Sequence, residues 1–169
     1  MQLVFDIETD DLKATKIWCI VAIDLNSEKV YSFKPDKIDE GIHLLEKADT
    51  LIGHNIIGFD IPIIEKLKGI NLFKNKTIID TLVLSRLFNP VREGGHSLES
   101  WGFKLKFHKD KQPTDFQEYT PEMLQYCIKD VRLNKKLFFH LKEEGKGFSK
   151  ESVSLEHEAS RVLSIQRAN

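Results

Sequence analysis

The sequence is poor in cysteine, in net charge and in long hydrophobic runs, and each shortage excludes a class of protein. Its 169 residues include two cysteines, Cys19 and Cys127, which do not make a disulfide framework; both lie in apolar runs, so we expect small core residues in a reducing cytoplasm. Because 25 basic side chains nearly balance 26 acidic ones, a polyanionic partner would need a local basic patch. No apolar run approaches the ~18 residues that span a bilayer, and no basic region opens a signal peptide, so neither membrane insertion nor secretion is expected.

What is present is a regular succession of strand and helix patterns. Residues 2 to 8 alternate in the strand manner, residues 17 to 24 are nearly all apolar, and residues 29 to 33 follow a turn, which predicts an antiparallel meander of three strands. The rest of the pattern predicts a helix over 35–48, a buried strand over 49–55, a helix from about Gly58 to Lys68, a strand over 77–80, and helices over 81–87, 97–103, 121–144 and 152–168. Strands that alternate with helices after a meander indicate an α/β fold with a mixed sheet and helices on its faces.

Asp6 and Glu8 are a pair of acids in an otherwise apolar first strand. Positions two apart on a strand face the same way, so both carboxylates project from one face. Parallel carboxylates repel each other unless a proton or a cation lies between them, and burying them without a partner is costly. An exposed strand end is the alternative interpretation.

Two further acids occur where chemistry is commonly placed in such folds. Asp60 ends the segment His54-Asn55-Ile56-Ile57-Gly58-Phe59-Asp60, at the transition from the buried strand to a helix, where α/β folds bind ligands. Asp130 lies one turn after Tyr126 on a common face of the long helix. The plain alternatives are a helix-start acid that complements the helix dipole and a boundary acid beside a core tyrosine.

The four acids would converge on one site if the first strand lies beside the 51–55 strand and the late helix packs across both. Oxygen ligands without a cysteine or histidine cluster suit a hard cation, so magnesium or manganese is indicated and zinc is disfavoured. Two ions held in this way would act on a phosphodiester, one generating hydroxide and the other stabilising the leaving oxygen.

The three motifs together, D-x-E, H-N-x-x-G-F-D and Y-x-x-x-D, resemble in order and spacing the exonuclease motifs of the DEDDy-type 3′–5′ exonucleases of the DnaQ-like, RNase H-like superfamily. Residues 79–87 and 96–102 are similar to the connecting region of the proofreading domains of A-family DNA polymerases, of the polymerase I and podophage type. The resemblance covers about residues 1–145 and implies an RNase H-like mixed sheet of about five strands with helices on both faces.

The resemblance also implies a role for individual residues. Asp6 would bridge two divalent cations, Mg²⁺ or Mn²⁺; Glu8 and Asp130 would bind the ion that activates water, Asp60 would support the second ion, and Tyr126 would orient the nucleophile. Other residues are implied in substrate binding or local packing: Thr9 and Asn55 on the terminal nucleotide, Phe59 or Leu12 against a base or the local core, and His54 as a supporting residue or an ordinary structural histidine.

The resulting functional hypothesis is an exonuclease that shortens single-stranded DNA from its 3′ end to nucleoside 5′-monophosphates. An RNase D-like RNA exonuclease is the alternative enzyme, because the sequence shows no decisive reader of the 2′-hydroxyl. A non-catalytic nucleic-acid-binding module of the same fold would be marked by a missing acid, and all four acids and the tyrosine are present.

The organisation implied is an exonuclease domain over residues 1–147 and a helical segment over 148–169 that resembles the start of a polymerase domain. We expect a monomer of the cytoplasm, or of the host cytoplasm if a phage encodes it, with no polymerase activity in this chain and with a polymerase domain in cis or in trans as a possible partner.

Three smaller expectations concern the middle of the chain. The segment 89–120 is rich in glycine, proline and charge and is expected to be flexible. It contains the most basic stretch, a candidate single-strand track or a solvated loop: Lys104, Lys106, His108, Lys109 and Lys111, interleaved with Phe103 and Phe107. Asp80 is interpreted as the N-cap of the helix starting at Thr81, and His96 and Trp101 as helix-start and core residues.

Overall fold

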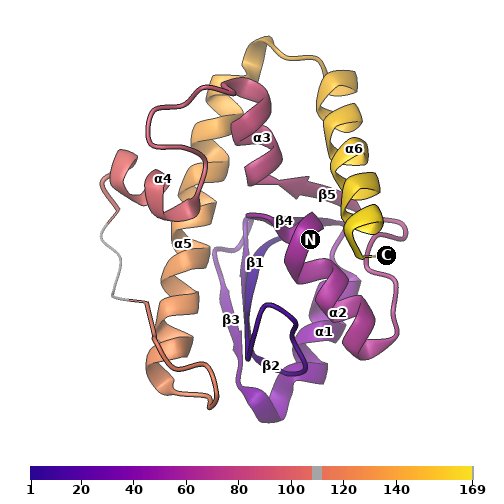
Figure 1. Cartoon of the computed structure of the whole chain (residues 1–169), viewed down its shortest axis with the longest axis vertical. Helices are drawn as coiled ribbons and strands as arrows, with labels where there is room; N and C mark the ends of the chain where they lie inside the picture. The colour runs from indigo at the N-terminus through magenta and orange to yellow at the C-terminus, as the bar shows by residue number, and fades with distance from the viewer. Residues whose placement is uncertain (108–111, 169) are drawn as a thin grey trace.

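A mixed sheet of five strands forms the centre of the protein. The computed structural model describes residues 1–107 and 112–168, and its strands run in the order β3-β2-β1-β4-β5 (Figure 1). The strands are β1 (Gln2–Thr9), β2 (Ile17–Asp24), β3 (Val30–Phe33), β4 (Thr50–Gly53) and β5 (Thr77–Asp80). The first three strands are antiparallel, while β4 is parallel to β1 and β5 is parallel to β4. The predicted α/β class, meander and mixed sheet are confirmed.

The helices lie close to the predicted segments. They are α1 (Ile38–Lys47), α2 (Ile61–Lys68), α3 (Thr81–Phe88), α4 (Leu98–Lys104), α5 (Pro121–Glu144) and α6 (Lys150–Ala168), with short 3₁₀ turns η1 (Pro35–Lys37) and η3 (Gly145–Gly147). The helix expected from about Gly58 begins as a π-helical turn, η2 (Ile56–Asp60), which continues directly into α2. Asn55, just before η2, has a left-handed conformation that asparagine tolerates.

Each face of the sheet packs against different helices. Leu3, Phe5 and Ile7 of β1 belong to a core shared with α1 and α2, whereas Val4 belongs to a core shared with α5. Figure 1 shows α5 running along one side of the sheet. Because side chains alternate along a strand, Asp6 and Glu8 project from the same face as Val4, toward α5.

The segment boundaries follow from caps that the sequence predicts. The Thr120 hydroxyl accepts a hydrogen bond from Met123 N at 3.2 Å, and Pro121 opens α5. The Asp80 carboxylate accepts a hydrogen bond from Leu82 N at 2.9 Å, which confirms its role as the N-cap of α3. Gly53 ends β4, where a Cβ would clash with the Ile56 side chain.

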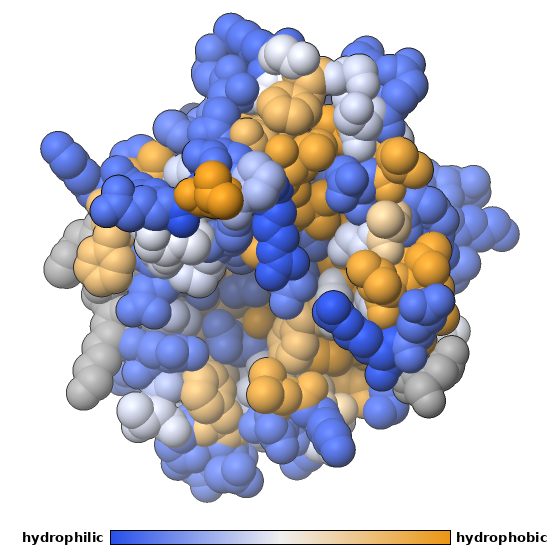
Figure 2. Space-filling model, turned by 45° about the horizontal axis from the view of Figure 1, so that its top comes forward, coloured by the Kyte–Doolittle hydropathy of each residue, from blue (hydrophilic) through white to orange (hydrophobic). Residues whose placement is uncertain are grey.

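The last helix, α6, packs on the end of the sheet where β5 and η2 lie. His157 Nε2 accepts a hydrogen bond from Asp80 N at 2.9 Å, and the Ser164 hydroxyl donates one to Ile57 O at 3.2 Å. Large apolar side chains of α6 are exposed, namely Leu155, Val162, Leu163 and Ile165. Figure 2 shows hydrophobic groups on the face that includes α6. Among the described residues, no helix has both the length and the apolar character needed to cross a bilayer.

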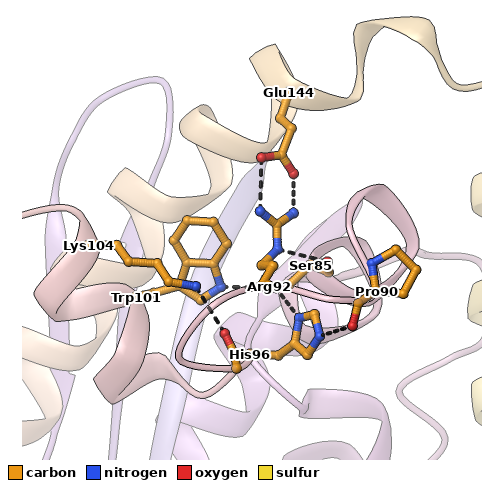
Figure 3. Close-up of polar contacts among 8 residues, drawn as sticks. Ser85, Pro90, Arg92, His96, Trp101, Lys104 and Glu144 are labelled. Carbon is orange, nitrogen blue, oxygen red and sulfur yellow. Dashed lines mark hydrogen bonds and ion pairs between the residues drawn. The ribbon is translucent and has the colours of Figure 1, made fainter.

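The glycine- and proline-rich segment after α3 is held by a polar network, in place of the flexibility expected for it. Arg92 forms a two-pronged ion pair with Glu144 of α5 and donates a hydrogen bond to Ser85 O at 3.0 Å (Figure 3). Trp101 is buried and donates a hydrogen bond to the Ser85 hydroxyl, which also lies 2.8 Å from His96 Nδ1. The core role of Trp101 is thereby confirmed, and the 92–104 part of the segment is fixed on α3 and α5.

Candidate functional site

Asp6 and Glu8 lie at the C-terminal half of β1, beyond the part of the strand that pairs with β4. Their carboxylates and the Cys127 thiol of α5 bring one potential ligand atom each to within 4.8 Å of one another. Cys127 Sγ is 3.7 Å from Asp6 Oδ2. The β1 alternation and the packing of α5 on this face therefore make one cluster of three potential metal ligands.

Asp60, the last residue of η2, lies next to this cluster. Ile7 N donates a hydrogen bond to Asp60 Oδ2 at 3.2 Å, and the Asp60 carboxyl is hydrogen-bonded to that of Asp6. Asp60 is 3% exposed. The π-helical turn, which adds one residue to the usual helical turn, thus directs this side chain back to the centre of β1.

The η2 turn is in turn held by a buried carboxylate. Asp80 accepts hydrogen bonds from Asn55 N at 2.8 Å and from Ile57 N at 3.0 Å, in addition to the cap of α3. Burial raises the pKa of Asp80, and these backbone donors oppose the rise. Asp80 therefore fixes the loop that carries Asn55 and Asp60, a role that its interpretation as a helix cap did not include.

Asp130 and Tyr126 complete the set from α5. Asp130 is buried, Tyr126 is half-buried one turn earlier, and Cys127 lies between them. The Asp130 charge is one of the causes of the shifted pKa of Asp6. The convergence condition is met: β1 lies beside β4, α5 packs across β1, and all four acids face one region.

The electrostatics of the cluster fit a divalent cation. Burial and, second to it, the neighbouring Asp130 charge raise the pKa of Asp6 from 3.8 to about 7. Burial and the Asp6 charge raise the pKa of Asp60 well above its usual range. Such acids are stable as anions only when positive charge is added between them.

Cys127 does not change the preference for a hard cation. Burial, with contributions from Cys19 and Asp6, raises the pKa of the Cys127 thiol well above its usual range. A neutral thiol is a poor metal ligand, because the thiolate is the form that coordinates. The oxygen atoms of the four acids are thus the ligands offered, and they suit magnesium or manganese better than zinc.

A cavity of about 320 Å³ opens beside Glu8 and contains several residues implied in substrate binding. Its lining includes Thr9, Leu12 and Phe59, together with Gln112 and Phe116 from the segment that precedes α5. Leu12 is 83% exposed, so the interpretation of it as a local core residue is wrong.

Asn55 and His54 are placed differently from the other candidates. Asn55 lines a neighbouring groove between α2, α3 and α6 that also includes Leu12. Both ring nitrogens of His54 have internal partners, Nδ1 at 2.9 Å from Thr81 Oγ1 and Nε2 at 2.9 Å from His96 O. Of the two interpretations left open for His54, the geometry favours the structural one, because its ring is fixed between β4 and the segment before α4.

Sequence reasoning missed Cys127, Gln112 and Phe116 as neighbours of the site. Helical spacing could have indicated Cys127, which is one turn from Asp130. No sequence signal indicates Phe116, whose carbonyl accepts a hydrogen bond from Trp18 Nε1 at 2.8 Å across 98 residues of chain.

The structure describes only part of the basic stretch over residues 103–111. Phe103 is 79% exposed, and Lys104 donates a hydrogen bond to Gly95 O at 3.1 Å. His108, Lys109 and Lys111 lie outside the described residues.

Comparison with known proteins relates the chain to nucleic-acid enzymes. No protein-family model matches it. Over an alignment 229 positions long, it is 27% identical to the DNA-directed DNA polymerase of Enterobacteria phage T3 and 26% identical to that of Escherichia phage T7. In both cases 99% of this chain is aligned to 32% of the polymerase, so the chain spans about a third of the length of these relatives.

Solved structures share the fold at lower sequence identity. Brucella melitensis NrnC matches with a TM-score of 0.71 and 17% identity over 98% of this chain and 85% of that one. Escherichia coli RNase D, described as an exoribonuclease involved in structured RNA processing, matches with a TM-score of 0.68 and 15% identity over 95% of this chain and 45% of that one. NrnC has also been solved with pGG and with Mg²⁺. The RNase H-like exonuclease fold is therefore confirmed.

The raised pKa of Asp6 predicts how the metal-free protein responds to pH. The pKa of the Asp6 carboxyl is 3.8 in the unfolded chain and about 7 in the folded protein. As pH rises, the unfolded chain therefore loses this proton at a lower pH than the folded protein does. The free energy of unfolding should fall between about pH 4 and pH 7, and Asp6 should cause no further decrease above that range. We expect the Tm in chelator to decrease across this window and Mg²⁺ to raise the Tm more at pH 8 than at pH 5.

The Asp6→Asn variant tests how much the Asp6 charge contributes to this pH dependence of folding stability. At pH 8 in chelator, its free energy of unfolding should exceed that of wild type by on the order of 1 to 4 kcal/mol. Mg²⁺ should raise its Tm less than that of wild type. Asp36→Asn, which alters an exposed acid remote from the cluster, is the matched control and should follow wild type. Equal pH slopes for wild type and Asp6→Asn would contradict the prediction.

Proposed function

Because the chain is homologous to the DNA polymerases of phages T3 and T7 and has the fold of the DnaQ-like exonucleases, we propose that it is a metal-dependent 3′–5′ exonuclease. Its substrate is the 3′ end of single-stranded DNA, its products are nucleoside 5′-monophosphates, and its role is proofreading beside a polymerase domain in cis or in trans. The observation that carries the proposal is the grouping of half-buried Asp6 and Glu8 with buried Asp60 and Asp130, an arrangement that divalent cations stabilise.

The four acids divide the work of holding two ions. Asp6 would be the ligand shared by both ions, Glu8 and Asp130 would hold one ion, and Asp60 would support the other. When bound, divalent cations lower the pKa of water and offset charge on the leaving oxygen. Mg²⁺ and Mn²⁺ are the ions that match these oxygen ligands.

The remaining residues of the site position the substrate and the nucleophile. The Tyr126 phenol, one helical turn before Asp130, orients the attacking water through a hydrogen bond. Thr9 and Phe59 line the cavity beside Glu8 and hold the terminal nucleotide, and the exposed Leu12 packs against a base at its edge. Trp18 holds the Phe116 carbonyl and so fixes the far wall of this cavity.

DNA is the preferred substrate in this proposal because both relatives are DNA polymerases. An RNA exonuclease is the second candidate. It is supported by the shared fold of RNase D, an exoribonuclease, and of NrnC solved with the dinucleotide pGG. The same acids would serve either sugar, since the reaction at phosphorus does not involve the 2′ position.

The first test is degradation of a single strand. With Mg²⁺ or Mn²⁺, a 5′-labelled oligonucleotide should shorten stepwise from its 3′ end, and chelator should stop the reaction. Asp6→Asn should lower kcat by about 100-fold or more, since it removes the ligand shared by both ions. Asp36→Asn should leave kcat unchanged. Full activity of Asp6→Asn would contradict the assignment of the metal site.

Tyr126→Phe tests the orientation of water separately from metal binding. The phenyl ring preserves packing and removes the hydroxyl, so kcat should fall about 10- to 100-fold with KM nearly unchanged. The Mg²⁺-dependent rise in Tm should be the same as in wild type. If kcat is unaffected, Tyr126 has no such role.

A comparison of DNA and RNA oligonucleotides of identical sequence separates the two candidate substrates. We expect a higher kcat/KM for DNA, measured side by side with the same ion and the same length. A preference for RNA would overturn the DNA assignment and support the second candidate.

A further inference from the structure

A second, larger hollow adjoins the cavity beside Glu8. It is a groove of about 770 Å³ between α2, α3 and α6. Leu12 lines both the cavity and the groove, and Asn55 of the loop that leads to Asp60 lines the groove. Figure 2 shows a hollow near the centre of the face that includes α6, with both hydrophobic and hydrophilic side chains around it. The groove therefore begins where the candidate site ends.

The groove is rich in unpaired positive charge. Lys13, Lys66, Arg86 and Arg167 line it and are exposed, and within the described part of the chain none of them forms an ion pair or a side-chain hydrogen bond. Some cations elsewhere in the described residues are instead held by carboxylates: Lys68 by Asp39, Lys135 by Glu28, Arg92 by Glu144 and Lys146 by Glu143.

Little negative charge offsets these cations. Glu156 is the exposed acid among the described lining residues, and the other acid, Asp80, is 1% exposed and bonded to three backbone N–H groups. A protein whose overall charge is −1 thus concentrates four cations against one exposed carboxylate at a single groove. This is the local basic patch that a polyanionic partner requires.

Between the cations, the walls of the groove are aliphatic. Ile63 comes from α2, Leu82 from α3 and Leu163 from α6, and Leu163 is 50% exposed. Aliphatic side chains flanked by cations suit a single strand, because the bases lose contact with water while the phosphates meet positive charge. These aliphatic side chains offer no hydrogen bonds that distinguish one base from another, so contacts with them would tolerate any sequence.

We propose that this groove binds the nucleotides that precede the 3′-terminal nucleotide, and that α6 forms its outer wall. The proposal rests on the proposed exonuclease function and names the part of the protein that selects a strand over a dinucleotide. It places the single-strand track in this groove and not along residues 103–111, since Lys104 is engaged with Gly95 O and with the Trp101 ring. The segment 148–169 then serves the exonuclease directly.

The experiment compares a 12-nucleotide single strand with a dinucleotide in each variant. Wild type should have a higher kcat/KM for the longer substrate, because only that substrate reaches the groove. Arg86→Glu and Lys66→Glu should each lower the ratio of kcat/KM for the 12-nucleotide strand to kcat/KM for the dinucleotide at least fivefold. The cause should be a higher KM for the longer strand. Arg167→Glu should do the same if α6 is a wall of the groove.

Salt dependence gives a second readout. The slope of log KM for the 12-nucleotide strand against log salt should weaken by about 0.7 for each phosphate contact removed. Glu156→Gln should have the opposite effect on KM and lower it, since it removes the one exposed carboxylate of the groove. A merely structural effect of these changes would not produce both trends.

Lys47→Glu is the matched control. Lys47 is an exposed cation in the last turn of α1, as Lys66 and Arg86 are in the last turns of α2 and α3, so the effect of reversal on the helix dipole is equivalent. Its length preference should equal that of wild type. If Lys106→Glu reduces the preference while Arg86→Glu and Lys66→Glu do not, the strand follows the 103–111 stretch and the groove proposal is overturned. Wild type without activity on either substrate would instead contradict the proposed function.

Discussion

The repulsion among four neighbouring carboxylates, two buried and two half-buried, is the constraint on which the rest of this structure depends. Asp6 is surrounded by Glu8, Asp60 and Asp130, and its pKa is raised to about 7 by burial and by the Asp130 charge. A fold that keeps such groups together in the absence of positive charge sacrifices stability. The packing around them must therefore be strong enough to hold the arrangement until cations bind.

That packing is supplied by elements that are distant in sequence. Two separate cores fix β1 from both faces, one with α1 and α2 and one with α5. Asp80 holds the η2 turn through backbone N–H groups, and α6 holds Asp80 and Ile57 through His157 and Ser164. Residues far from the acids thus determine where Asp60 lies, and any change that loosens α6 or α3 would be transmitted to it.

The relatives give this arrangement its functional context. The two phage polymerases align with nearly the whole chain, whereas the chain spans about a third of each polymerase. NrnC and RNase D share the fold although their identity to this chain is below 20%. The fold is common to proteins whose described ligands differ, so the substrate has to be decided by features around the acids. In this protein the aliphatic, cation-lined groove beside Leu12 is the feature best suited to such a decision.

Much of the site could be predicted from spacing. Alternation along β1 places Asp6 and Glu8 on one face, and helical periodicity places Tyr126 and Asp130 one turn apart; both depend on local geometry that the chain itself sets. The caps at Asp80 and Thr120 are local for the same reason. The π-helical form of the first turn, Ile56–Asp60, could not be predicted, because nothing in the spacing of residues distinguishes it from an α-helical start.

The sequence by itself determined the strand and helix segments, the pairing of acids within each motif and the preference for a hard cation, because these follow from the chemistry and periodicity of neighbouring residues. Tertiary structure alone decided that Cys127 and Phe116 adjoin the acids, that His54 is held by internal hydrogen bonds, and that Lys13, Lys66, Arg86 and Arg167 line one groove. These residues come from separate parts of the chain. Their proximity depends on how the sheet and helices pack, and no local pattern encodes that packing.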